Sequence, residues 1–225
     1  YQQLQSVESK RLDRHGEPYG NDQFNYDWNV QNWTVTPDSN GKSIMYTNGA
    51  PLDYFEQPWV NLGLWAGNKF IWAHMLAAKP FLDGVAEGDL ASDYKLSDDG
   101  LTLTFTMRDG IKWHDGAPIT TDDVTWSLEF ALKTPNLHGV LASVFNSIDG
   151  AADYVAGKAE HVSGISADGK TVTIKFSKPN ANTLLAFTQW GPFPKKHFEG
   201  VEPALVQQAP FWQKPIGSGP FMVEE

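Results

Sequence analysis

The chain contains no cysteine. It can therefore form no disulfide bond, and no thiolate can act as a nucleophile or a metal ligand. Positive charge is also scarce, because 17 Lys and Arg residues stand against 27 Asp and Glu residues, for a formal net charge of −10. Nucleic-acid binding needs clustered Lys and Arg for the phosphates, so we expect no nucleic-acid partner.

Long hydrophobic runs are missing as well. The longest covers residues 70–78, is interrupted by His74, and is too short to cross a bilayer. No charged-then-apolar leader precedes Tyr1, so we expect a signal peptide to have been removed or to lie outside this sequence. With 225 residues and 41% hydrophobic content, the chain can build one large domain or two small ones. This composition is compatible with a periplasmic or secreted domain.

Residues 101–107 alternate strictly, with apolar side chains at the odd positions and threonine at the even ones. That period of two predicts a half-buried strand, which we expect to pair with residues 94–96 as a hairpin around the turn at Gly100. Residues 165–176 repeat this pattern around Asp168-Gly169. Two similar hairpins predict neighbouring strands of one small antiparallel sheet.

The clearest helix begins at Asp122. Thr120 can cap its free N–H groups, Asp123 can complete a capping box, and Thr134-Pro135 ends it. Other predicted elements are a polar arm at 1–42, a first core strand at 43–47, helices at 68–78, 150–156 and 182–187, and the start of a strand at 221–223.

The ordered string from 96 to 116, which contains Arg108-Asp109-Gly110 and Trp113-His114-Asp115-Gly116, is followed by Pro118, Thr120 and Asp123. It resembles the signature of the family 5 extracellular solute-binding proteins, the receptors of oligopeptide, dipeptide, nickel and some oligosaccharide ABC importers. Further matches occur at 171–179, 193–195 and 216–221. The resemblance runs from about Ser43 to the last residue and implies that 43–225 form lobe I of a two-lobed receptor, with the second lobe absent and the chain truncated.

Candidate catalytic groups all have simpler explanations. His114 and Asp115 could form a general base, but neighbouring side chains of an extended segment point to opposite sides, and Asp115 belongs to a turn. Asp122 and Asp123 suit a helix N-terminus, and Ser218 lacks the flanking pattern of a nucleophile elbow. The six histidines show no metal-binding spacing. We therefore expect no catalytic residue, no protein metal site and no cofactor, and a protein that is not an enzyme, although nickel carriage occurs in the resembled family.

Nine tryptophans are many for this length. Trp59, Trp65 and Trp190 fall in irregular segments, where flat indole faces can meet sugar rings or apolar peptide side chains in a cleft. The alternative is that these tryptophans fill the core, which is the more frequent case for any single tryptophan. The resemblance implies further ligand contacts from the loop after the first strand, at Asn48, Gly49 and Ala50, and from the loop that runs from Asn136 to Leu141.

The expected fold is α/β, a class II periplasmic-binding-protein-like lobe with a mixed core sheet and an added small antiparallel sheet. The resemblance implies a monomeric substrate-binding component of an ABC importer. It would capture an extracytoplasmic oligopeptide or oligosaccharide between two lobes and deliver it to the permease subunits. The expected location is periplasmic or extracellular, with membrane association through the transporter. The alternative is a secreted glycoside hydrolase or carbohydrate-binding module, which needs two carboxylates facing each other across a cleft.

Overall fold

A computed structural model describes residues 11–13, 33–41, 58–60, 71–78 and 86–222. The chain divides into two compact units, Tyr1–Leu52 and Asp53–Glu225. In the first unit, β1 (Leu12–Asp13) and β2 (Thr34–Val35) form an antiparallel pair. The main chains of Arg11 and Thr36 extend this pair, because the Thr36 N–H donates to the Arg11 carbonyl over 2.8 Å.

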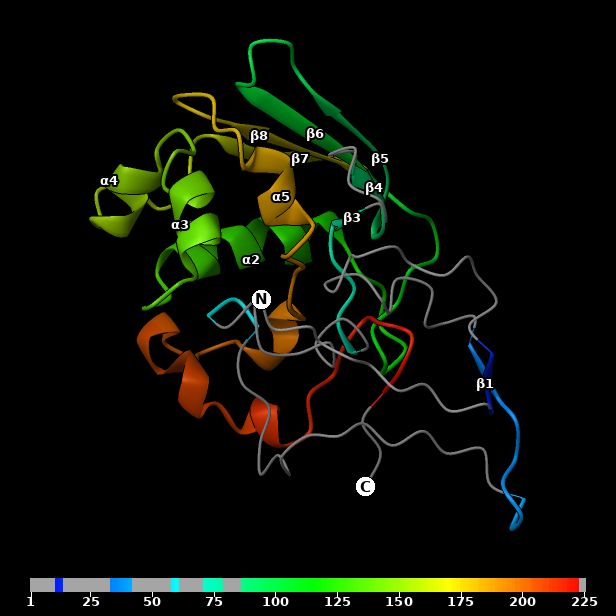
Figure 1. The fold of residues 1–225 in the computed structure, drawn as a ribbon. Helices are drawn as coiled ribbons and strands as arrows, with labels where there is room; N and C mark the ends of the chain where they lie inside the picture. Colours follow the sequence, from blue (N-terminus) through cyan, green and yellow to red (C-terminus); the bar gives the residue numbers. More distant parts are fainter. Residues whose placement is uncertain (1–10, 14–32, 42–57, 61–70, 79–85, 223–225) are drawn as a thin grey trace, which may run out of the picture. The chain divides into compact units, whose positions relative to one another are not determined.

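A four-stranded antiparallel sheet organises the second unit (Figure 1). Its order is β5 (Ala91–Leu96), β6 (Thr102–Met107), β8 (Thr171–Lys175) and β7 (Ile165–Asp168). Both predicted hairpins are therefore confirmed, and β6 and β8 join them into the one sheet that their similarity predicts. A separate pair is formed by β3 (Leu76–Ala78) and β4 (Ala86–Gly88).

The register of the sheet separates a core face from a polar face. Phe105 lies opposite Val172, and Leu103 lies opposite Ile174, and all four side chains are fully buried. Threonines fill the positions between them on both central strands. The strict alternation of the sequence thus becomes one buried face and one hydroxyl-rich face.

Helices cover the buried face (Figure 1). They are α2 (Thr121–Leu132), α3 (Gly139–Phe145) and α5 (Thr183–Phe187), whereas α4 (Ala151–Val155) lies beside α3 at the left of Figure 1. The predicted capping box is present, because the Thr120 side chain accepts from the Asp123 N–H and the Asp123 carboxylate accepts from the Thr120 N–H. Short 3₁₀ helices follow on the other side of α2: η2 (Lys195–His197), η3 (Pro203–Gln208) and η4 (Pro210–Gln213).

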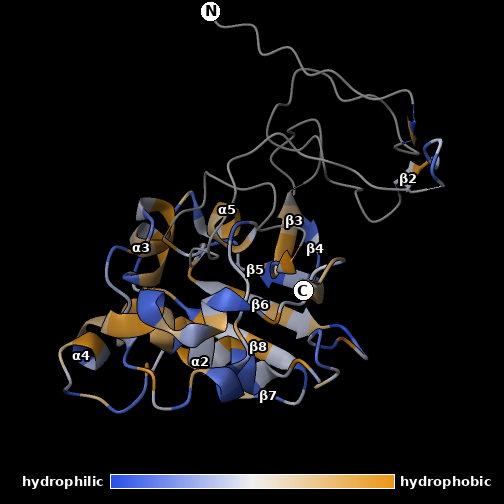
Figure 2. Cartoon of the chain, turned by 90° about the horizontal axis from the view of Figure 1, so that it is seen from below, coloured by the Kyte–Doolittle hydropathy of each residue, from blue (hydrophilic) through white to orange (hydrophobic). Residues whose placement is uncertain are grey.

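Two predicted elements are wrong in the residues that the structure describes. The helix expected at 68–78 is helical only at Ile71, and residues 76–78 are strand β3, which Figure 2 colours as hydrophobic. Phe221 and Met222 belong to no strand. The expected first core strand at 43–47 lies outside the described residues, and every strand pair within them is antiparallel, so they contain no mixed sheet.

Candidate ligand-binding site

Trp59 joins three segments that are distant in the sequence. Its indole N–H donates to the Gly191 carbonyl over 3.0 Å, and its main-chain carbonyl accepts from the His138 N–H over 3.0 Å. The sequence predicted ligand contacts from all three of these segments, namely at Trp59, in the loop 136–141 and at Trp190. The structure brings them together at one junction, residues 58–60, 136–141 and 189–193, which we call the Trp59 junction.

Glycine at position 191 allows two main chains to approach closely in this junction. A Cβ atom built on Gly191 would overlap the main-chain carbonyl of Ala73. Beside it, the Met75 N–H donates to the Trp190 carbonyl over 3.0 Å. Residues 73–75 therefore pack directly against residues 190–191 of the junction. An L side chain at position 191 would push them away.

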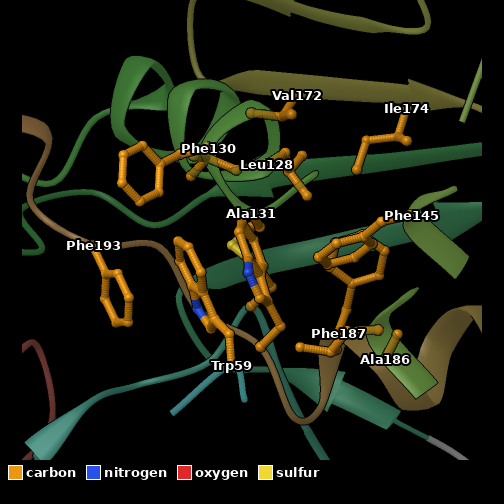
Figure 3. Close-up of a cluster of buried hydrophobic side chains, with 14 of the residues drawn as sticks. Trp59, Leu128, Phe130, Ala131, Phe145, Val172, Ile174, Ala186, Phe187 and Phe193 are labelled. Carbon is orange, nitrogen blue, oxygen red and sulfur yellow. The ribbon is translucent and has the colours of Figure 1, made fainter. Parts of the chain in front are cut away.

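The two described candidate tryptophans lie in the core. Trp59 is 1% exposed and stacks on Phe193 with ring centroids 4.0 Å apart. Figure 3 shows the two rings side by side. Trp190 is 0% exposed and meets the edges of Phe145 and Phe187. Both indoles therefore occupy the core, as in the alternative stated above, because protein rings cover their faces. A ligand contact by either residue stays a prediction.

The indole nitrogens of the two tryptophans differ in their bonding. Trp59 Nε1 has its acceptor at Gly191, whereas Trp190 Nε1 has no hydrogen-bond partner in the described part of the chain. The side-chain oxygen of the preceding residue, Gln189, is likewise buried without a partner there. Each buried polar group left unpaired costs about 1–3 kcal/mol. The junction therefore contains one buried donor and one buried acceptor that have no hydrogen-bond partner in the described part of the chain.

The loop between α2 and α3 places its predicted residues differently. Asn136 is exposed and has a φ of 58°, a left-handed conformation that asparagine tolerates better than most residues. Leu141 is 0% exposed within α3. His138 caps α3 by accepting the Val140 N–H at Nδ1. Of the two predicted residues, Asn136 is thus the one that solvent or a ligand reaches directly. Asn48, Gly49, Ala50 and Trp65 lie outside the described residues.

His114 and Asp115 do not form a dyad. The His114 ring bonds to Gly217 and Gly219, whereas Asp115 accepts from the Ala117 N–H and pairs with Lys196 and His197. The hydrogen bond from Lys196 is the largest cause that lowers the pKa of Asp115 from 3.8 to about 2. Asp115 is therefore an ionised structural carboxylate at neutral pH, not a general base.

The other candidate groups also have structural partners. Asp122 pairs with Lys195 Nζ over 2.8 Å, which is the main cause that raises the pKa of Lys195, while Asp123 accepts from the Lys195 N–H. The Ser218 hydroxyl accepts from the Ala73 N–H over 3.1 Å. Among the described residues, no group of three His, Asp or Glu side chains could hold a metal ion. Of the helices in that same part of the chain, none has the length and apolar character needed to cross a membrane.

A shallow polar groove of about 340 Å³ lies on α3. Its lining includes Ser143, Asn146 and Lys178, on the opposite side of α3 from the buried Leu141 and Phe145. The sequence did not predict this groove. It also did not single out His138, Gly191 or Phe193 for the Trp59 junction, although the Trp-Gly-Pro string at 190–192 was a signal that two main chains meet there.

The comparisons with known proteins agree with this architecture. The model of the bacterial extracellular solute-binding proteins, family 5 Middle, matches residues 86–225, and the chain belongs to this family. The oligopeptide-binding protein OppA of Bacillus subtilis is 34% identical over 118 residues, which cover 51% of this chain and 22% of OppA. The chain spans about a quarter of the length of the curated relatives it matches.

Solved structures show the same fold. NikZ from Campylobacter jejuni in complex with Ni(L-His) is 26% identical with a TM-score of 0.55, and the match covers 70% of this chain and 28% of NikZ. AppA from Bacillus subtilis in complex with a nonapeptide is 22% identical with a TM-score of 0.63, over 80% of this chain and 33% of AppA. The expected combination of helices with small antiparallel sheets is therefore shown, and the family is one of binding proteins.

Proposed function

We propose that this chain forms part of lobe I, class II in type, of a receptor that captures an extracytoplasmic peptide and delivers it to the permease subunits of an ABC importer. The receptor acts as a monomer in the periplasm or outside the cell and associates with the membrane through the transporter. It changes no bond in its ligand.

The Trp59 junction is the observation that carries this proposal. It unites the three described segments that the sequence assigned to ligand contact, and it holds them by hydrogen bonds of 3.0 Å at Trp59. Asn136 at its edge offers an exposed amide, and a side-chain amide can pair with both the N–H and the C=O of a peptide group.

A peptide is favoured over an oligosaccharide by these same atoms. A peptide main chain presents one donor and one acceptor per residue, and the exposed Asn136 amide can pair with both. An oligosaccharide would need an exposed indole face for its ring, whereas Trp59 and Trp190 are 1% and 0% exposed. OppA of Bacillus subtilis, by its name, binds oligopeptides.

A glycoside hydrolase is not proposed. Its chemistry needs two carboxylates that face a common substrate. Asp115, Asp122 and Asp123 are each engaged by lysine side chains, main-chain N–H groups or a helix N-terminus. The carboxylates that the sequence offered for acid–base work are thus used to hold the fold.

A thermal-shift panel on the full-length receptor tests the proposal, with di- to pentapeptides in one arm and oligosaccharides in the other. We expect peptides to raise the melting temperature and oligosaccharides to leave it unchanged. Calorimetry with the best peptide then compares the receptor with its Asn136→Ala variant, for which we expect weaker binding. Asn180→Ala is the control, on a partly exposed amide whose bonds run to Ser143 and to the Asn182 N–H. Stabilisation by oligosaccharides alone, or release of reducing sugar from a polysaccharide, would overturn the proposal.

A further inference from the structure

The His114 ring is held at both nitrogens by one turn near the end of the described chain. The Gly217 N–H donates to Nδ1 over 3.2 Å, and Nε2 lies 2.8 Å from the Gly219 carbonyl oxygen. The His114 N–H also donates to the Gly217 carbonyl over 2.9 Å. Three bonds therefore tie this residue to residues 217–219, and the binding proposal above uses none of them.

These partners specify the protonation of the ring. A main-chain N–H can only donate, so Nδ1 must carry a lone pair toward Gly217. A carbonyl oxygen can only accept, so Nε2 must carry the proton toward Gly219. The bonding therefore assigns His114 as the neutral ring with its proton on Nε2, since the other tautomer and the charged ring would each break a bond.

The turn that His114 holds is itself bonded to the irregular segment 71–75, which packs against the Trp59 junction. The N–H groups of Ser218 and Gly219 donate to the Ile71 carbonyl over 2.9 and 2.7 Å, and the Ala73 N–H donates to the Ser218 hydroxyl. A Cβ atom on Gly217 would overlap the Ile71 carbonyl oxygen. Residues 217–219 are thus packed directly between His114 and residues 71–73.

Residues 73–75 in turn set the position of the junction. The Ala73 carbonyl lies against Gly191, and the Met75 N–H donates to the Trp190 carbonyl. Gly191 is the acceptor of the Trp59 indole N–H. A continuous chain of direct contacts therefore runs from the His114 ring, through residues 217–219 and 71–75, to the residues proposed to receive ligand.

We infer that His114 is a positioning residue of the ligand site: its neutral Nε2–H ring fixes the turn 217–219, and this turn fixes residues 71–75 behind Trp190 and Gly191. The inference rests on the proposed function for the meaning of the site. The contact chain itself does not depend on which ligand binds.

Variants of His114 in the full-length receptor test the inference by nuclear magnetic resonance. His114→Ala removes both ring bonds, whereas His114→Asn places an amide oxygen where Nδ1 accepts, and His114→Gln places an amide nitrogen where Nε2 donates. His161→Ala is the matched control, because the His161 ring is exposed and pairs with Glu129. The readouts are the imidazole nitrogen shifts, hydrogen exchange at the Ala73 and Met75 amides, and the indole resonance of Trp59.

We expect the wild-type His114 ring to carry its proton on Nε2. In His114→Ala, exchange at Ala73 and Met75 should rise about tenfold, as expected for the loss of one hydrogen bond, and the Trp59 indole resonance should move. His114→Asn should recover part of both effects, and His161→Ala should show neither. Across this series of variants, the affinity for trialanine should fall as the protection of the Ala73 and Met75 amides from hydrogen exchange falls.

Three results would overturn the inference. One is a wild-type His114 ring with its proton on Nδ1, a result that does not depend on the folding of any variant. Another is a His114→Ala protein in which Ala73, Met75 and the Trp59 indole are unchanged. The third is a loss of trialanine affinity that is equal in the Ala and Asn variants. If wild-type receptor does not bind trialanine or any other peptide, the proposed function fails, while the magnetic resonance results still decide the role of His114.

Discussion

The Trp59 indole N–H donates to the main-chain carbonyl of Gly191 across 132 positions of sequence, and this buried bond measures 3.0 Å. Trp190, beside that acceptor, has an indole N–H with no partner in the described part of the chain. Two buried tryptophans whose rings stack at 6.0 Å thus differ in one hydrogen bond. This difference allows the contribution of the Trp59 hydrogen bond to stability to be measured.

Trp59→Phe should destabilise the protein more than Trp190→Phe, by about 1–3 kcal/mol in the free energy of unfolding. Both substitutions remove similar ring volume, but only the first leaves the buried Gly191 carbonyl unpaired. Urea unfolding of the two variants measures the difference. Equal stabilities of the two variants would show that the Trp59 N–H bond to Gly191 contributes nothing measurable to the fold.

Gly191→Ala should destabilise the fold by more than 2 kcal/mol, roughly the cost of overpacking a rigid site, because its Cβ would overlap the Ala73 carbonyl. Gly139→Ala is the matched control within α3, where a Cβ meets nothing within 4 Å. Gly139 is the first residue of α3, so this control should be neutral or stabilise by up to about 0.5 kcal/mol, chiefly through a less flexible unfolded chain. Thermal unfolding of both variants checks this difference, and a tolerated Gly191→Ala would show that the main chains there are not in close contact.

Thr120→Ala should cost about 1 kcal/mol, because it removes the side-chain oxygen that caps α2. Thr125→Ala lies in the middle of the same helix and should be neutral or slightly stabilising, since alanine has the higher helix propensity. Denaturant unfolding of the two variants compares them directly. Equal costs would mean that the capping box contributes nothing measurable to α2.

We expect the free energy of unfolding to fall in acid as Asp115 becomes protonated. Its folded-state pKa of about 2 lies below the ordinary 3.8, chiefly because Lys196 donates to it, so the ionised form stabilises the fold. This contribution is complete above about pH 5 and is lost as the pH falls through about 2. Because the Lys196 side chain is 51% exposed, we expect only about 1 kcal/mol from it.

Unfolding of wild type and Asp115→Asn between pH 7 and pH 2 measures this contribution. The asparagine oxygen can still accept the Ala117 N–H, so the comparison removes mainly the ion pairs. The stability difference should shrink as the pH falls. A difference that is constant with pH would show that the carboxylate charge does not stabilise the fold, and Asp98→Asn, at an exposed turn position, serves as the neutral control.

The predictions that proved correct were based on local sequence patterns. The alternation at 101–107 and the turn at Asp168-Gly169 depend only on neighbouring residues, and both appear as hairpins of one sheet. The Thr120 cap likewise depends on contacts three residues apart. The string from 96 to 116 also identified the family, because it combines several motifs at fixed spacing.

The helix predicted at 68–78 failed for the opposite reason. A short apolar run has no period that distinguishes a strand from a buried helix. Residues 76–78 pair with β4, and the N–H of Met75 bonds to Trp190, a partner 115 positions away. Tertiary hydrogen bonds therefore decided the conformation of this segment.

By itself, the sequence determined the local elements, the family, and which segments to inspect for a ligand, because these follow from side-chain period, turn chemistry and motif spacing. Only the tertiary structure decided that Trp59 lies buried against Phe193 with its N–H on Gly191, that Asn136 is exposed, and that His114 and Asp115 have separate partners. Burial and long-range hydrogen bonds depend on which distant residues meet, and no local pattern contains that information.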